Sequence, residues 1–183
     1  GGFQQVTGLD FSTRFFRLAA RMQEEGHLRY AFPEEGEIVS FHEVTLAEFG
    51  LEQTKQQVQF YQADACNLPE KFHGYDLVLA ANLIDRLYSP RRFLSTIHQR
   101  MNQGGLLVLT SPYSWSEEFT KKEEWLGGYR EAGEPVWGID GLKAVLSPRF
   151  RLLGDPQDLP FVIRETRRKF QHSIAELTIW GLL

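Results

Sequence analysis

Two nearly continuous apolar runs, separated by an amphipathic helical segment, constrain the fold of this chain more than any other feature. The runs cover residues 76–81 and 106–110, and such runs are typical of strands covered on both faces. Between them, Pro90 marks a helix start, and Phe93 and Ile97 lie on one apolar stripe. This order predicts a parallel pair of strands joined by a helical crossover.

The rest of the chain extends this alternation. Residues 3–10 predict a strand that ends in an acid, and Ser12 is a candidate N-cap for a helix over residues 13–23. Before the first apolar run, periodicity and turn residues predict a loop over 24–36, an extended piece over 37–42, a short helix over 45–55 and a strand over 58–62. Further along, they predict a helix end at Gly104 and Gly105 and a helix over 141–146 capped by Asp140. Antiparallel strands are expected over 150–153 and 174–180. The expected fold class is α/β, with a Rossmann-like, doubly wound, mostly parallel sheet and an antiparallel C-terminal edge.

Length, charge and cysteine content narrow the class of protein. The 183 residues fit a single domain. With 20 basic and 24 acidic residues the net charge is −4, which argues against a nucleic-acid binder that relies on overall basicity. The single cysteine, Cys66, excludes an intramolecular disulfide and suits a reducing compartment. Because we find neither a signal-peptide pattern nor an apolar run of about 20 residues, we expect a cytoplasmic protein with no membrane partner.

Two acids follow two of the predicted strands, where ligands bind in parallel sheets. Asp10 ends the strand over residues 3–10 and can accept hydrogen bonds from the two hydroxyls of a ribose. Asp64 follows the strand over 58–62 and can accept from an exocyclic amine, while the backbone N–H beside it, at Ala65, can meet a purine ring nitrogen. The alternatives are a solvated or helix-capping acid at Asp10 and an Asx turn at Asp64. Taken together, the two acids favour a nucleotide-like ligand.

A polar residue also follows the apolar strand over residues 76–81. Asn82 stands where a side chain would face the reactive group of a ligand. The alternative is that Asn82 caps a short helix, with Asp85 and Arg86 forming a surface ion pair of little consequence.

Large rings and one basic residue supply the remaining candidates. Tyr113, Trp115 and Trp125 follow the last parallel strand, and they can stack on a planar ligand or belong to a lid over residues 111–139. A small satellite core under a long loop is the alternative. Arg164 can hold an anionic substrate group, or it can belong to a solvated connection between edge strands.

Several kinds of chemistry have no motif in the sequence. The five histidines show no metal-ligand spacing, so no metal site is expected. A GxSxG elbow and a Walker motif are also missing, so no motif in the sequence supports a hydrolase or a phosphoryl-transfer enzyme.

The ordered set of strand ends resembles a known enzyme class. Residues 64–69, 76–78 and 104–109 are similar to class I S-adenosylmethionine-dependent methyltransferases. A more specific resemblance, to the methyltransferase of ovothiol biosynthesis, lies in five segments: residues 6–12, 80–87, 110–115, 125–128 and 160–165. That family methylates a ring nitrogen of 5-thiohistidine (also numbered 4-mercaptohistidine), and it often occurs as the C-terminal domain of a larger protein with an iron-dependent sulfoxide synthase.

The resemblance implies roles for individual residues. It implies that S-adenosylmethionine is the cofactor, with Asp10 at its ribose, Asp64 and Ala65 at its adenine and Asn82 near its methyl group. Phe11 is a further cofactor-binding candidate. We hypothesise that Tyr113, Trp115 and Trp125 wall the imidazole of a thiohistidine-like substrate and that Arg164 pairs with its carboxylate. Asn82 and Tyr113 are then the candidate catalytic residues, and an iron-dependent sulfoxide synthase is the expected fused or paired partner.

One departure from the family keeps other functions open. The glycine-rich loop that follows the family's first strand has no counterpart in residues 1–183, so we expect a single methyltransferase domain without that first βα unit, which could be inactive alone. A non-catalytic Rossmann-like binding module is one alternative. A nicotinamide-dependent oxidoreductase is another, although no Tyr-x-x-x-Lys pair is present.

Overall fold

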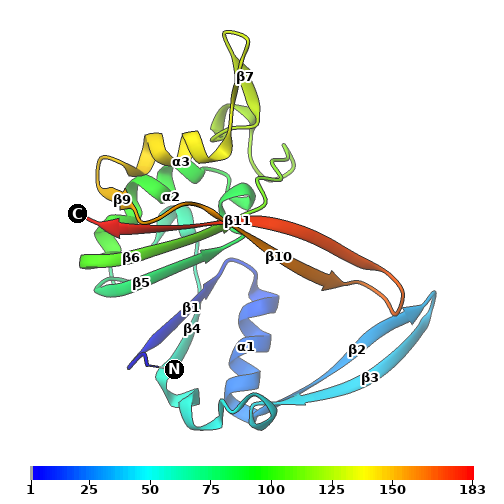
Figure 1. The fold of residues 1–183 in the computed structure, drawn as a ribbon. Coiled ribbons are helices and arrows are strands. Elements are labelled where there is room, and N and C mark those ends of the chain that lie inside the picture. Colours follow the sequence, from blue (N-terminus) through cyan, green and yellow to red (C-terminus); the bar gives the residue numbers. More distant parts are fainter. Residues whose placement is uncertain (1) are drawn as a thin grey trace. The chain divides into compact units, whose positions relative to one another are not determined.

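The computed structural model describes residues 2–183 and separates into two compact units (Figure 1). Unit 1 extends to Ala65 and also contains Ile163–Gln171. Unit 2 contains Cys66–Val162 and His172–Leu183.

Unit 1 is built on a pair of parallel strands and one helix. Strand β1 (Val6–Asp10) pairs with β4 (Val58–Gln62), and Asp10 lies opposite Gln62 at their carboxyl ends. Helix α1 (Thr13–Glu25) ends at Gly26, whose φ of 77° allows its N–H to reach the carbonyl of Met22 at 3.0 Å. The Gln23 side chain joins α1 to β4 by donating to the carbonyls of Lys55 and Val58. The strand and helix expected over residues 3–23 are confirmed.

The loop expected over residues 24–36 is wrong, because this segment forms one strand of a hairpin. Strand β2 (His27–Glu35) pairs with β3 (Ile38–Thr45) across a turn at Gly36, whose φ is 57°. Pro33 suggested a loop, but a two-stranded ribbon leaves it at an edge beside an irregularity in the register, where its missing N–H is tolerated. The Tyr30 ring stacks on His42 at 5.5 Å between centroids, which stabilises the ribbon across its strands.

The helix expected over residues 45–55 is replaced by two 3-10 turns. These are η1 (Ala47–Phe49) and η2 (Glu52–Gln57). Gly50 separates them with a φ of 65°, a conformation that ends a helix.

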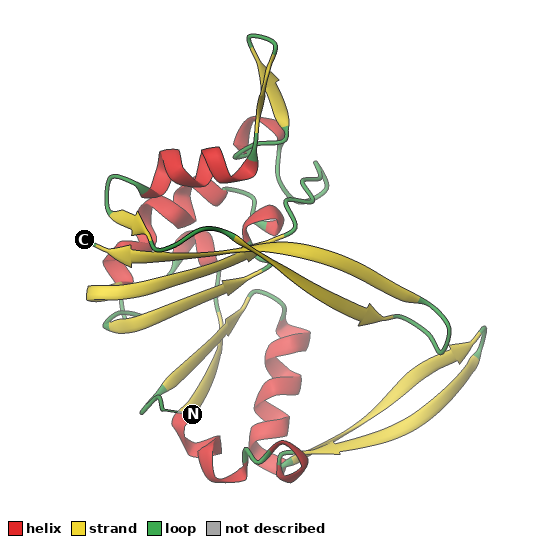
Figure 2. Ribbon diagram, in the orientation of Figure 1, coloured by secondary structure: helices red, strands yellow, loops and turns green. Residues whose placement is uncertain are grey.

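Unit 2 contains a five-stranded sheet (Figure 2). Strand β5 (Tyr75–Ala81) is parallel to β6 (Met101–Ser111), and β6 is antiparallel to β11 (Phe170–Leu182). Strands β10 (Gln157–Arg164) and β9 (Phe150–Leu152) both pair with β11. The expected α/β class and its antiparallel edge are confirmed, whereas β10 was not expected from the sequence.

Helices α2 and α3 lie together on one face of this sheet (Figure 1). Helix α2 (Pro90–Thr96) begins at the expected proline and continues as the 3-10 turn η5 (Ile97–Arg100). Helix α3 (Gly138–Leu146) begins three residues earlier than expected. The Asp140 carboxylate does cap it, by accepting the N–H of Trp137 at 3.1 Å from within the first turn.

Gly104 and Gly105 do not end a helix, since they lie inside β6. The register of β6 against β5 shifts there, so that Met101 faces Tyr75 but Leu106 faces Leu77. A Cβ on Gly105 would lie 2.9 Å from the carbonyl oxygen of Asn102, which explains the glycine.

The remaining short elements either flank β5 or follow β6. The 3-10 turns η3 (Ala65–Asn67) and η4 (Ile84–Arg86) flank β5. The 3-10 turn η6 (Lys122–Glu124) and the hairpin of β7 (Tyr129–Glu131) with β8 (Glu134–Val136) follow β6. Among residues 2–183, no helix combines the length and apolar character needed to cross a membrane.

Candidate functional site

The carboxyl ends of β1 and β4 bring together the acids expected at a nucleotide. The Asp10 carbonyl accepts the N–H of Ala63 at 3.1 Å, and the Gln62 side chain donates to the carbonyl of Phe11 at 3.0 Å. Asp64 and Ala65 therefore follow β4 at the same end of the strand pair at which Asp10 and Phe11 follow β1.

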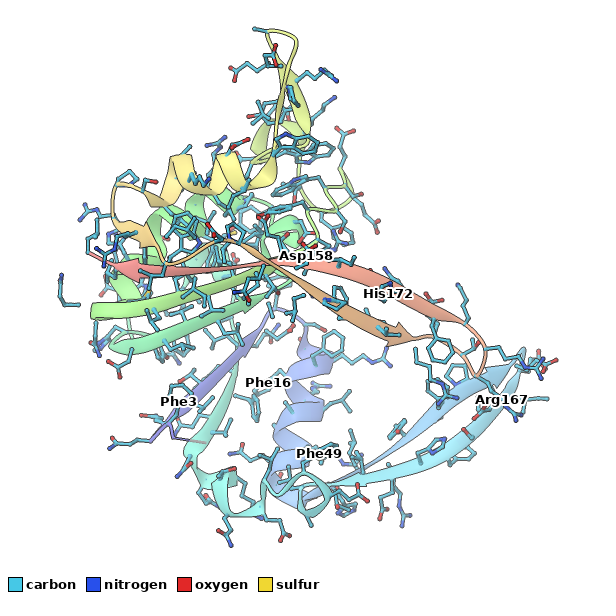
Figure 3. All side chains as sticks on the ribbon, viewed as in Figure 1. Phe3, Phe16, Phe49, Asp158, Arg167 and His172 are labelled. Atoms are coloured by element: carbon cyan, nitrogen blue, oxygen red, sulfur yellow. The ribbon has the colours of Figure 1, made fainter. Side chains whose placement is uncertain are left out.

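The side chains at this end have a chemistry that fits an adenosine group. One oxygen of Asp10 accepts the N–H of Ser12 at 2.6 Å, as in an Asx turn, and the carboxylate is exposed. The Phe11 ring is 75% exposed, so it offers an apolar surface beside an acceptor for hydroxyl groups. A neighbouring hollow lies between α1 and the strands, where Phe16 projects toward β1 and β4 (Figure 3), and its lining is Gly8, Leu9, Asp10, Phe15, Phe16, Ala19, Phe60 and Tyr61.

In unit 2, Asn82 is held at the end of β5 by Thr110 of β6. The Asn82 N–H donates to the carbonyl of Thr110 at 2.9 Å, and the Thr110 hydroxyl donates to the Asn82 side-chain oxygen at 3.0 Å. The φ of Asn82 is 49°, in the left-handed region that asparagine tolerates better than most residues. Asn82 does not cap η4, whose N-cap position is Leu83, so the helix-cap alternative is wrong.

The interpretation of Asp85 and Arg86 as a surface pair is also wrong, because Asp85 is only 1% exposed. Its carboxylate accepts from the hydroxyl of Ser111 at 3.2 Å, from the hydroxyl of Ser114 at 2.8 Å and from Arg86 at 3.2 Å. Arg86 also donates to the carbonyl of Ser114 at 2.9 Å and covers the ring of Phe119. This network fixes the turn that carries Tyr113.

Tyr113 occupies a strained but well-supported position in that turn. Its φ is 50°, which is costly for a bulky residue, and its N–H donates to the hydroxyl of Ser111 at 3.0 Å. Its phenol hydroxyl donates to the carboxylate of Glu176 on β11 at 2.7 Å. Its ring lies against Gly138, where any Cβ would overlap it.

The surroundings keep the Tyr113 phenol protonated. Burial raises the pKa of Tyr113 most, followed by its hydrogen bond to Glu176 and by the negative charges of Glu176, Asp140 and Asp85. Tyr113 is thus a neutral hydrogen-bond donor at physiological pH.

Sequence reasoning missed Glu176. It stands opposite Ser111 in the β6–β11 register, which brings it to Tyr113. The one signal for it in the sequence is an acidic residue inside the otherwise apolar run of residues 174–182.

The two tryptophans expected at the site stack on each other. The rings of Trp115 and Trp125 are 6.3 Å apart between centroids and nearly parallel, and the Trp125 indole donates to the carbonyl of Thr120 at 2.8 Å. Thr120 in turn donates to the carbonyl of Leu87 at 2.7 Å. The segment is therefore anchored to unit 2, while the Trp115 indole nitrogen is buried without a partner among the described residues.

Arg164 lies in unit 1, whereas the three aromatic candidates lie in unit 2. Its guanidinium covers the ring of Phe32 on β2 at 4.4 Å and donates to the carbonyl of Thr166 at 3.3 Å. Within residues 2–183, no group of three histidine, cysteine or acidic side chains is placed to hold a metal ion.

A family model described as a methyltransferase domain matches residues 1–109, which is more than half of the chain. The chain belongs to this methyltransferase family. Its fold is the α/β fold of class I Rossmann-like methyltransferases, and its cofactor is S-adenosylmethionine. The expected class, fold and cofactor are confirmed.

Solved structures share the fold of this methyltransferase. An S-adenosylmethionine-dependent methyltransferase from Methanosarcina mazei matches with a TM-score of 0.57 and 17% identity, over 98% of this chain and 82% of that chain. A structure that concerns the conversion of a disulfide bond into a thioacetal group during echinomycin biosynthesis matches with a TM-score of 0.57 and 15% identity, over 99% and 67%. The carbon methyltransferase CurJ matches with a TM-score of 0.52 and 18% identity, over 97% of this chain but only 41% of CurJ. No curated protein sequence matches the chain.

Proposed function

We propose that this methyltransferase methylates a ring nitrogen of 5-thiohistidine in ovothiol biosynthesis. One observation supports this proposal above the others: two of the segments that resemble the ovothiol family, residues 80–87 and 110–115, form one hydrogen-bonded assembly. Asn82 bonds to Thr110, and Asp85 bonds to Ser114, so the two segments support each other at the ends of β5 and β6.

The cofactor-binding roles follow from the chemistry of the strand ends. S-adenosylmethionine supplies a methyl group on a positively charged sulfur, which a nitrogen lone pair can attack. We assign Asp10 and Phe11 to the ribose side, Asp64 and Ala65 to the adenine, and the side-chain amide of Asn82 to the methionine end. Positioning of this kind accounts for most of the catalysis in methyl transfer, since no covalent intermediate with the protein is needed.

The substrate side is assigned to Tyr113, Trp115 and Trp125, with residues 111–139 as the lid. The substrate is a small molecule of the thiohistidine type, and nucleic acids and membranes are not partners. A fused or paired iron-dependent sulfoxide synthase makes the sulfoxide precursor, and the reaction takes place in the cytoplasm.

The test is a methyl-transfer assay with S-adenosylmethionine and 5-thiohistidine, read by mass spectrometry of the methylated product. We expect product with the wild-type chain, and a rate about 10²-fold lower with Asn82→Gly, which keeps the positive φ but removes the side-chain amide. Asp155→Asn changes an exposed acid outside the site and serves as the matched control.

Two outcomes would contradict the proposal. Methylation of histidine or of another amine in preference to thiohistidine would reject the substrate. Failure of calorimetry to detect S-adenosylmethionine binding would indicate a non-catalytic module instead.

A further inference from the structure

We propose that Glu176 is the carboxylate that binds the acceptor ring and takes its proton, and that Tyr113 positions Glu176 and is not itself the base. This inference rests on the proposed function, because it names the group that handles the proton in the same reaction. The inference also widens the expected substrates from thiohistidine to other small nitrogen-containing rings that become cationic when they are methylated.

The first step of the argument is the position of Glu176. It lies on β11 opposite Ser111, and β6 separates β11 from β5, so Glu176 and Asn82 belong to the same end of the β5–β6–β11 sheet. Glu176 is half-buried, which leaves part of its carboxylate open to a ligand. One oxygen accepts from Tyr113, and the other makes no hydrogen bond within the described part of the chain.

The second step excludes Tyr113 as the base. Its pKa is raised by burial and by the neighbouring carboxylates, so the phenol holds its proton at the pH of the reaction. Its hydroxyl donates a hydrogen bond to Glu176, its ring packs against Gly138, and its backbone N–H donates to Ser111, so Tyr113 is held beside Glu176.

The third step excludes the other two carboxylates that face Tyr113. Asp85 is fully buried, and its oxygens are occupied by two serines and Arg86. Asp140 caps α3 through the N–H of Trp137. Asp140 is exposed and makes no hydrogen bond to Tyr113 within the described residues, so among the three Glu176 alone is both partly open and held by the Tyr113 hydroxyl.

The chemistry balances with Glu176 in this role. One ring nitrogen uses its lone pair to form the bond to the methyl carbon, while the carbon–sulfur bond breaks and leaves its electron pair on sulfur. The ring becomes cationic, and the adjacent carboxylate stabilises that charge. The proton on the other ring nitrogen then passes to Glu176, which leaves a neutral methylated ring and a carboxylic acid that loses its proton to water.

The closing experiment compares the wild type with Glu176→Gln, which keeps the shape and an acceptor for Tyr113 but removes the charge. We expect kcat for methyl transfer to 5-thiohistidine to fall about 10²-fold or more, with an unchanged KM for S-adenosylmethionine. Tyr113→Phe retains the carboxylate, so we expect it to keep more activity than Glu176→Gln. The exposed Glu70→Gln is the matched control and leaves kcat unchanged.

A binding measurement separates this inference from the proposed function. By NMR titration, the wild-type chain is expected to bind imidazolium at pH 5.5 at least about tenfold more tightly than neutral imidazole at pH 8.5. Glu176→Gln removes this preference. An unchanged preference or an unchanged kcat in Glu176→Gln would overturn the inference, and so would a wild-type chain that binds no imidazolium. If the wild type binds imidazolium through Glu176 but does not methylate thiohistidine, the proposed substrate fails and the role of Glu176 stands.

Discussion

Asp85 and Arg86 are neighbours in the sequence but have opposite environments in unit 2. The carboxylate of Asp85 is buried and satisfied by four hydrogen-bond donors, whereas the guanidinium of Arg86 is partly exposed. This buried carboxylate is the shared acceptor of a hydrogen-bond network, and its loss leaves several polar groups without a partner.

We therefore expect Asp85→Ala to destabilise the protein by about 1–3 kcal/mol, because the hydroxyls of Ser111 and Ser114 lose their acceptor in a dry site. Urea unfolding followed by circular dichroism measures the change. Asp155→Ala, which removes an exposed carboxylate, is the control and should stay within about 0.5 kcal/mol of the wild type. Equal midpoints for the two variants would show that the network contributes nothing.

The same comparison shows which site residues a sequence can reveal. Asp10, Asp64 and Asn82 were predictable as candidates because each lies at or just after the end of a recognisable strand. Glu176 and the burial of Asp85 were not, since both depend on the antiparallel register of β11 against β6 and on the turn at Ser114. No local pattern encodes a contact between residues so distant in the chain.

At the level of elements, strands β5 and β6 were predictable from their nearly continuous apolar runs, although Leu79 of β5 is 61% exposed and burial is concentrated in the second half of β6. The β2–β3 hairpin was not predictable, since its residues are mostly exposed and its stability comes from cross-strand pairs such as Tyr30 with His42. The start of α3 was also missed, because glycines at its first and fourth positions have low helix propensity. Tertiary packing requires both of them.

Gly141 in α3 provides a prediction that opposes helix propensity. In an isolated helix, Gly→Ala stabilises by about 0.5–1 kcal/mol. In this structure a Cβ at residue 141 would overlap the carbonyl of Leu126, which is backbone and cannot rotate away. We expect Gly141→Ala to destabilise the protein by about 1–3 kcal/mol, measured as a lower thermal midpoint. Lys143→Ala changes an exposed position on the same helix and should have little effect; stabilisation by Gly141→Ala would contradict the close packing.

At the scale of the whole molecule, the two units differ in how much core they have. Every fully buried residue among those described lies in unit 2, including Leu107, Leu142 and Trp180. In unit 1, β1 and β4 pair only with each other within the described residues, and α1 buries no residue completely. A two-stranded parallel sheet with so little core is marginally stable, since parallel strands depend on covered faces. The α/β alternation of the sequence predicted the class of both units but not this difference, because burial depends on how many neighbours each strand acquires.

This difference, together with the proposed cofactor site at Asp10, predicts how S-adenosylmethionine changes local stability. Without the cofactor, we expect the backbone amides of β1 and β4 to exchange with solvent far faster than those of β6 and β11, which pack in the core of unit 2. A ligand that binds only the folded form of unit 1 stabilises it by about 2.7 kcal/mol at 100 times its Kd, so exchange in β1 and β4 should slow selectively. Hydrogen–deuterium exchange with mass spectrometry measures this.

Asp10→Asn is the discriminating variant for that experiment. It retains the oxygen that accepts the N–H of Ser12, so the turn into α1 is preserved, but it removes the charge and one acceptor for ribose hydroxyls. We expect exchange in the free variant to match the wild type and the cofactor-dependent protection of β1 and β4 to be lost at the same ligand concentration. Protection confined to β6 and β11, or full protection in Asp10→Asn, would contradict the assignment of the adenosine group to the ends of β1 and β4. The first result would move the cofactor's main anchor into unit 2, where Asn82 and Thr110 form a hydrogen-bonded strand end. The second would show that the charge of Asp10 is not needed for cofactor binding.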